Sequence, residues 1–212
     1  MKEELQTQDL VELFAHFRAV MEAKKEFLIE LDGKVGDSDL GLTMSKGFAA
    51  AADAVAGSTE PVGKLLVRAG MAIAKAAPST MGTLVATGFM RGGRALEGAT
   101  RIGTPEMRSF WEAFLNGILE RGKAKAGDKT VVDALVPAVR ALEKAAASGE
   151  ALPAALAEAA AAAAAGVEAT KDMVAQHGKA ACFQEKTRGL PDAGATVGFV
   201  IVDAVREFVT RT

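Results

Sequence analysis

Tyrosine is absent from this chain of 212 residues, and tryptophan and cysteine each occur once. Aromatic residues make up only 5% of the sequence although 50% of it is hydrophobic, so aliphatic residues and alanine supply most of the apolar content. Alanine is the best intrinsic helix former. Strand-favouring residues form no alternating runs. The composition therefore predicts an all-α protein.

An excess of charge of either sign is also lacking, because 25 lysines and arginines face 27 aspartates and glutamates. These charges are mixed along the chain without a basic stripe, so we expect no nucleic-acid partner. The single cysteine, Cys182, cannot form a disulfide within the chain, which suits a reducing compartment. The charged segment 1–5 lacks the apolar core of a signal peptide. We expect a cytoplasmic protein.

Long hydrophobic runs are missing as well. The alanine run 159–165 is too short and too weakly hydrophobic to span a bilayer, so no membrane partner is expected. We interpret the run as a helix that packs closely through small side chains. No long linker divides the chain, which predicts a single domain over residues 1–212.

Apolar residues recur at helical spacing in eight segments, which glycine, proline and capping residues separate. Because the connections are mostly short, neighbouring helices should be antiparallel, in an up-and-down bundle or barrel. The expected helices are 7–31, 42–56, about 61–76, about 80–92, 104–122, one opening at 127–130, one starting at 152, and a last one through 197–208 after a loop from 178 to 194.

The most informative segment is acidic and glycine-rich. Asp32, Asp37 and Asp39 lie within eight residues, among three glycines that let the backbone turn tightly. Their mutual repulsion favours a bound cation, and an oxygen-only ligand set suits Mg²⁺ or Ca²⁺. An EF-hand is excluded because the twelfth position from Asp37 is Phe48 rather than glutamate. A solvated loop whose aspartates cap the next helix is the alternative.

A second candidate is the basic, glycine-rich segment 121–130. It resembles a Walker A loop, but Asp128 separates Gly127 from Lys129, and the segment follows a helix where that motif follows a strand. The P-loop interpretation is therefore excluded. What remains is a helix N-terminus, which favours anions, or ordinary capping by Asp128 or Thr130.

Two further loops, 77–83 and 192–196, also precede helices and are typical of N-caps when taken alone. Neither His16 nor His177 shows the spacing of a metal ligand or a catalytic base, so we assign both a structural role. Cys182 has no activating neighbour in the sequence and is interpreted as an unreactive thiol.

Taken together, the motifs resemble the L subunit of dihydroxyacetone kinases, the nucleotide-binding half of those enzymes. The resemblance spans nearly the whole chain, and it implies a barrel of eight antiparallel helices with the nucleotide at one end. Its most specific pieces are Gly36-Asp37-Ser38-Asp39, Arg121-Gly122-Lys123-Ala124 with Gly127-Asp128-Lys129-Thr130, and Asp192-x-Gly194-Ala195.

The resemblance also implies the site. Asp32, Asp37 and Asp39 would hold two Mg²⁺ ions that bridge the phosphates of ADP or ATP. The residues that would bind the nucleotide are Leu40, Gly41, Thr43, Ser79, Thr80 and Met81 around the phosphates, Gly122 and Val131 on the adenosine side, Lys179, and the turn Asp192, Ala193 and Gly194.

Several positions depart from the family pattern. Leu40 replaces a common histidine, Thr43 an asparagine, Lys179 an arginine and Ala193 a proline. The loop 78–82 also differs from the family's Gly-Gly-Ala-Ser-Gly. The aspartate triad is intact, so the resemblance still implies Mg-nucleotide binding.

The implied activity is phosphoryl transfer to a small ketose held by a separate K subunit. The nucleotide is either exchanged as ATP or kept as ADP and rephosphorylated by a phosphotransferase-system protein, and the residues do not decide between these modes. The alternatives are a nucleotide-binding regulatory module, a kinase acting on another ketose or an acyl group, and a helical interaction protein without a site. A homodimer is also compatible with the sequence.

Overall fold

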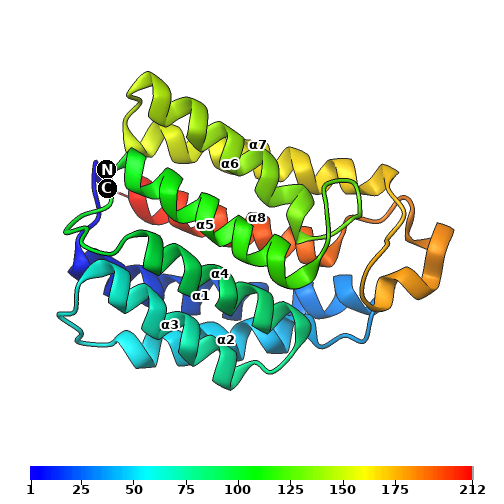
Figure 1. The fold of residues 1–212 in the computed structure, drawn as a ribbon. Coiled ribbons are helices and arrows are strands. Elements are labelled where there is room, and N and C mark those ends of the chain that lie inside the picture. Colours follow the sequence, from blue (N-terminus) through cyan, green and yellow to red (C-terminus); the bar gives the residue numbers. More distant parts are fainter. Residues whose placement is uncertain (212) are drawn as a thin grey trace.

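The computed structural model describes residues 1–211, which contain eight α-helices, two 3-10 segments and no strand (Figure 1). The elements are α1 (Thr7–Gly33), α2 (Leu40–Val55), α3 (Val62–Ala76), α4 (Thr80–Ala95), α5 (Thr104–Gly122), α6 (Val131–Ser148), α7 (Leu152–Ala169), η1 (Thr170–Asp172), η2 (Lys179–Thr187) and α8 (Ala193–Thr210). The all-α prediction is confirmed.

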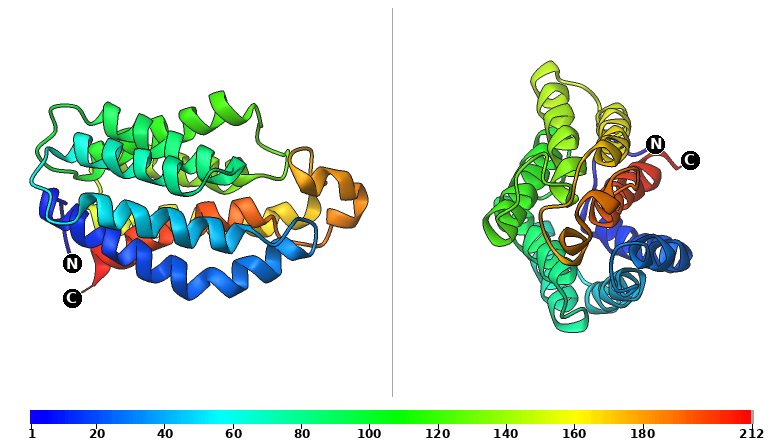
Figure 2. Two further views of the ribbon diagram at one scale, coloured as in Figure 1. Left: turned by 90° about the horizontal axis from the view of Figure 1, so that it is seen from below. Right: turned by 90° about the vertical axis from the view of Figure 1, so that its right-hand side faces the viewer.

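The helices run up and down, each packing against the next, and α8 returns to α1 to close a barrel (Figures 1 and 2). This topology places the N-termini of α2, α4, α6 and α8 at one end, together with the 3-10 segments. The described chain ends lie at the opposite end, where Leu5 and Ile102 form an isolated antiparallel bridge. We call the end with the 3-10 segments the loop end.

The few aromatic residues are concentrated inside the barrel. Phe14, Phe17, Phe48, Phe89 and Phe114 are all buried, and the Phe89 and Phe114 rings meet edge to face with centroids 5.4 Å apart. Burying one such side chain stabilises a fold by roughly 1.5–3 kcal/mol. An aromatic cluster from α1, α2, α4 and α5 therefore forms one part of a core to which all eight helices contribute.

Close helix contacts explain the main error in the predicted boundaries. We predicted that α4 ends at the two glycines at 92–93, but it continues to Ala95. A Cβ atom on Gly93 would lie 2.6 Å from the carbonyl oxygen of Gly63, and one on Gly63 would lie 2.6 Å from that of Gly93. These glycines are packing sites between α3 and α4 and do not stop the helix.

Two other boundaries differ near the loop end. Helix α1 continues to Gly33, so Asp32 lies in its last turn, and α2 begins at Leu40, two residues before the predicted start. The segment predicted as a loop after Gly178 contains η2, and α8 already begins at Ala193. As a result of the shifts at α1 and α2, the segment between the end of α1 and the start of α2 is shorter than predicted, and it contains Asp37 and Asp39.

The alanine run 159–165 lies within the longer helix α7. The stretch Leu152–Asp172 is long and apolar enough to cross a membrane by length and composition, although half of its most apolar window is buried inside the protein. It packs against α6 and α8. Buried helices of globular cores share these properties, so the finding is weak evidence for a span.

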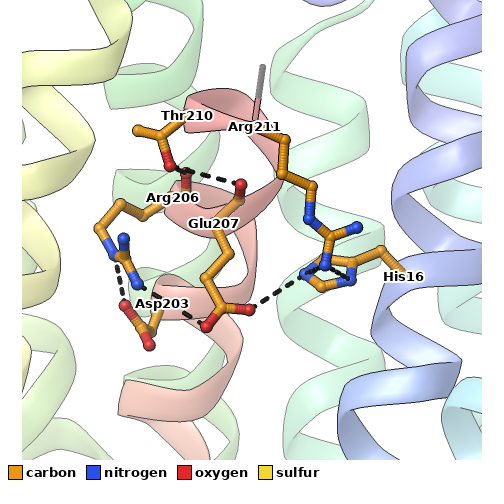
Figure 3. A network of polar contacts seen from close by, with 6 residues as sticks. All are labelled: His16, Asp203, Arg206, Glu207, Thr210 and Arg211. Atoms are coloured by element: carbon orange, nitrogen blue, oxygen red, sulfur yellow. Dashed lines mark hydrogen bonds and ion pairs between the residues drawn. The ribbon is translucent and has the colours of Figure 1, made fainter. Parts of the chain in front are cut away.

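A polar network joins α8 to α1 away from the loop end (Figure 3). Nη2 of Arg211 lies 2.8 Å from Nδ1 of His16, and Glu207 lies 3.4 Å from the other ring nitrogen. Burial, followed by the charge of Arg211, lowers the pKa of His16. His16 is therefore part of the α1–α8 interface, as its predicted structural role requires.

Candidate metal and nucleotide site

Four connections meet at the loop end: the α1–α2, α3–α4, α5–α6 and α7–α8 segments. The up-and-down order explains this arrangement, because every connection from an odd-numbered helix to the next even-numbered helix lies at the same end. The first turns of the even-numbered helices carry N–H groups without a partner inside the helix, and the positive ends of the helix dipoles. Anions are favoured at such a place.

The predicted aspartate triad is assembled there. Carboxylate oxygens of Asp32, Asp37 and Asp39 all lie within 4.8 Å of one another. Asp32 comes from the last turn of α1, Asp37 from the loop, and Asp39 directly precedes α2. Three hard oxygen donors from one short segment suit Mg²⁺, which takes carboxylates together with water and substrate phosphates.

Position 36 in this segment has no room for a side chain. A Cβ atom there would lie 2.2 Å from Oδ1 of Asp32. Ser38 adopts a left-handed conformation with φ of 62°, which non-glycine residues adopt only rarely. Oδ2 of Asp32 accepts a hydrogen bond of 3.1 Å from the Asp39 N–H. The turn therefore directs the three carboxylates toward one another.

The alternative of simple helix capping is not what the structure shows for Asp39. This residue occupies the N-cap position of α2, but its side chain makes no capping hydrogen bond. Desolvation, followed by the charges of Asp37 and Asp32, raises the pKa of Asp39. A cation between the carboxylates would relieve that repulsion.

Lys179 supplies the positive charge nearest the triad. Its ammonium, at the start of η2, forms an ion pair with Oδ2 of Asp37. The hydrogen bond from Lys179 lowers the pKa of Asp37. The predicted nucleotide residue Lys179 therefore lies at the triad itself.

The residues predicted to surround the phosphates lie at the first turns of α2 and α4. Leu40 is only 6% exposed and packs in the core, so only its backbone is available to a ligand. The Ser79 hydroxyl accepts a hydrogen bond of 3.0 Å from the Gly82 N–H and caps α4. The remaining predicted residues of this group, Gly41, Thr43, Thr80 and Met81, lie within the first two helical turns.

Three predicted nucleotide residues from different helices, Met81, Val131 and Gly194, lie close together. A Cβ atom on Gly194 would lie 2.8 Å from Cε of Met81 and 3.4 Å from the backbone nitrogen of Val131. One on Gly122 would lie 3.2 Å from Leu84 of α4. The N-termini of α4, α6 and α8 thus adjoin one another, with the end of α5 beside α4.

The last predicted turn is defined by Asp192. Its Oδ2 accepts a hydrogen bond of 2.7 Å from the Ala195 N–H and caps α8. Burial raises the pKa of Asp192 to about 6, although hydrogen bonds from Ala195 and the charge of Lys129 oppose the increase. Ala193 and Gly194 form the first turn of α8.

The α5–α6 loop is not a P-loop. The Lys129 side chain is 2% exposed and points away from solvent, and its ammonium donates to the carbonyl oxygens of Thr170 and Leu190. Thr130 caps α6 by accepting from the Val132 N–H. The lysine that a Walker A loop would present to phosphate is therefore engaged inside the protein.

Sequence reasoning missed that this loop is held by buried charges. Asp133 is 6% exposed and accepts hydrogen bonds from the N–H groups of Gly127 and Thr130. Asp128, 8% exposed, lies 3.0 Å from Nε2 of His177. The spacing Thr130-x-x-Asp133 is a capping-box pattern, and it could have predicted the hydrogen bond from the Thr130 N–H to Asp133.

Comparison with known proteins identifies the family of the chain. The DAK2 domain family model matches residues 34–207, so the chain belongs to the DAK2 domain family. Over 178 residues it is 30% identical to the "PEP-dependent dihydroxyacetone kinase, ADP-binding subunit DhaL" of Escherichia coli, with 84% of this chain and 85% of that protein covered.

Larger kinases contain a similar domain. The chain is 34% identical over 191 residues to an L-erythrulose kinase of Pectobacterium atrosepticum, covering 89% of this chain and 32% of that protein. It also matches the crystal structure of the dihydroxyacetone kinase of C. freundii in complex with AMP-PNP and Mg²⁺, with a TM-score of 0.70, 26% identity, and coverage of 93% of this chain and 33% of that one. The chain thus spans about a third of the length of each of these two matched chains.

Proposed function

We propose that this protein is the nucleotide-binding subunit of a dihydroxyacetone-type kinase, a single Mg-nucleotide-binding domain that works with a separate ketose-binding K subunit. The observation that carries the proposal is the cluster of Asp32, Asp37 and Asp39 at the end where four helix N-termini meet. Carboxylates alone would repel a nucleotide, and helix N-termini alone would hold phosphate without a metal. Their combination suits a Mg-nucleotide.

The triad would hold two Mg²⁺ ions, which neutralise charge on the phosphates when bound. The first turns of α2 and α4 would orient the phosphates through backbone N–H groups, and Lys179 would add a mobile positive charge. Phosphoryl transfer depends mainly on such positioning and electrostatic stabilisation. The acceptor hydroxyl and its base would belong to the K subunit.

Three exposed apolar side chains on elements that reach the loop end support a partner protein there. Phe183 of η2, Phe27 near the end of α1 and Leu42 in the first turn of α2 are 40%, 51% and 41% exposed. Large exposed apolar side chains are common in protein interfaces. A homodimer remains a prediction that light scattering can test.

The E. coli relative is a PEP-dependent kinase subunit that binds ADP, and the Lactococcus lactis relative is PTS-dependent, which together favour bound ADP that a phosphotransferase-system donor rephosphorylates. The erythrulose kinase relative supports a second candidate acceptor, a four-carbon ketose. We place the protein in the cytoplasm, where its exposed Cys182 would stay reduced.

Calorimetric titration of ADP into the nucleotide-free protein, with Mg²⁺ and with EDTA, tests the proposal. We expect Mg-dependent binding in the wild type and its loss in Asp37→Asn. Asp53→Asn, an exposed aspartate near the end of α2 that pairs with Arg18, is the matched control. A wild type that binds neither ADP nor ATP would refute the kinase function. ADP released from denatured protein would support the cofactor mode.

A further inference from the structure

Most of the buried polar side chains in the described chain lie in one cluster beside the candidate site. They come from the α5–α6 loop and the start of α6, and from the α7–α8 connection and the start of α8. The members are Asp128, Lys129, Asp133, Thr170, Thr187 and Thr196. Buried polar groups are costly unless they are hydrogen-bonded, so a concentration of them calls for an explanation.

Lys129 is the central member. Its ammonium donates to the carbonyl oxygen of Thr170 at the end of α7 and, at 2.6 Å, to that of Leu190. Neither acceptor carries a charge, and burial lowers the pKa of Lys129 while the charge of Asp192 opposes that decrease. A charged group in this position is held in one geometry because no solvent can replace its partners.

Both acceptors flank the turn that leads into α8. The Thr170 hydroxyl accepts a hydrogen bond of 2.9 Å from the Asp192 N–H, and Leu190 precedes Asp192 by two residues. The Asp192 side chain in turn caps α8. The position of this turn therefore depends on the end of the Lys129 side chain.

The other end of Lys129 belongs to the start of α6. Its backbone has φ of 61°, and Thr130 directly caps α6. The start of α8 lies close to the start of α6, because a Cβ atom on Gly194 would lie 3.4 Å from the backbone nitrogen of Val131. One side chain thus spans from the N-terminus of α6 to the turn before α8.

We propose that Lys129 is a positioning residue for the nucleotide: by tying the α7–α8 connection to the α5–α6 loop, it fixes the spacing between Val131 and the Asp192–Gly194 turn. The inference rests on the proposed function and on the family resemblance, which implies that Val131 contacts the adenosine side and that Asp192–Gly194 form a nucleotide-contacting turn. Lys129 does not contact the nucleotide, since its ammonium is buried and engaged. Its loss should therefore affect the adenosine side and leave the metal triad intact.

The test compares two ligands, Mg-ADP and Mg-pyrophosphate, by calorimetry. Pyrophosphate reaches the triad and the phosphate-binding turns but has no adenosine. In Lys129→Met we expect ADP affinity to fall about tenfold, the size expected when a hydrogen bond to a buried charge is removed. Pyrophosphate affinity should not change, and Lys129→Arg should recover part of the ADP affinity.

Lys125→Met is the matched control, because it removes the same charge from an exposed position of the same loop. If Lys129→Met does not fold by circular dichroism, Lys129→Gln carries the test, since it removes the charge but keeps a neutral hydrogen-bond donor at this position. Unchanged ADP affinity, or an equal loss for both ligands, would overturn the inference. Failure of the proposed function would instead be seen in the wild type, as an absence of ADP binding.

Discussion

Lys179 and Asp37 form an ion pair across 142 residues of sequence, and it links η2 to the metal triad. The lysine side chain is 65% exposed and the aspartate side chain 37%, so the pair is accessible to solvent and to ligands. In the proposed function, Mg²⁺ at Asp37 would displace or share this ammonium. Lys179 would then compete with the metal in the free protein and become available to phosphate once the metal is bound.

Lys179→Met should accordingly have opposite effects on two ligands. Affinity for Mg²⁺ alone should rise a few-fold, because the triad loses a competing cation, while Mg-ADP should bind more weakly because a phosphate contact is lost. Exposed ion pairs have small effects, which limits the first change. Calorimetry with each ligand measures both, and Lys186→Met, another exposed lysine of η2, is the control. If both affinities rise, or both fall, Lys179 does not both compete with the metal and bind phosphate.

Repulsion within the triad should be visible as a metal-dependent stability. We expect Mg²⁺ to raise the thermal unfolding temperature of the wild type but not that of Asp39→Asn. In EDTA the variant should be at least as stable as the wild type, because the raised pKa of Asp39 shows that its charged form is disfavoured in the fold. A variant that is clearly less stable in EDTA would argue that Asp39 has a structural role.

Asp192 predicts a pH dependence. Its folded pKa of about 6 exceeds its ordinary value of 3.8, so the folded state holds a proton that the unfolded state releases between these values. Stability from this group is present below about pH 4 and is lost as the pH rises toward 6. Asp192→Asn keeps an N-cap but cannot ionise. Urea unfolding should show a larger stability advantage for the variant at neutral pH than at acidic pH, and an equal advantage at both would exclude this origin.

The contact between α3 and α4 should be sensitive to a single methyl group. Gly63→Ala places a Cβ atom 2.6 Å from the Gly93 carbonyl oxygen, and we expect a loss of about 1–3 kcal/mol in the free energy of unfolding. In Gly47→Ala the nearest atoms are side-chain carbons at 3.3 Å, so the gain in helix propensity should offset most of the crowding. Chemical denaturation of both variants checks this difference, and equal effects would show that the α3–α4 contact adjusts freely.

The departure at the end of α4 has a cause that the sequence alone does not reveal. Gly92 and Gly93 are typical of a helix end in the sequence, yet in the structure they admit Phe110 and the Gly63 backbone against α4. A glycine that permits a close approach and one that ends a helix look the same until the neighbouring helix is known. Leu40 is a second case in which the neighbouring helices decide. The sequence places it in a ligand-binding turn, but its side chain packs in the core.

The sequence by itself determined the eight helices, their antiparallel order and the acidic motif, because helical periodicity, caps and short connections are local properties. Only the tertiary structure decided that Lys129 lies buried against Thr170 and Leu190, and that Lys179 meets Asp37. These pairs join residues far apart in the chain. Their formation depends on how the α7–α8 connection folds over the loop end, which the packing of the whole barrel fixes and no local pattern specifies.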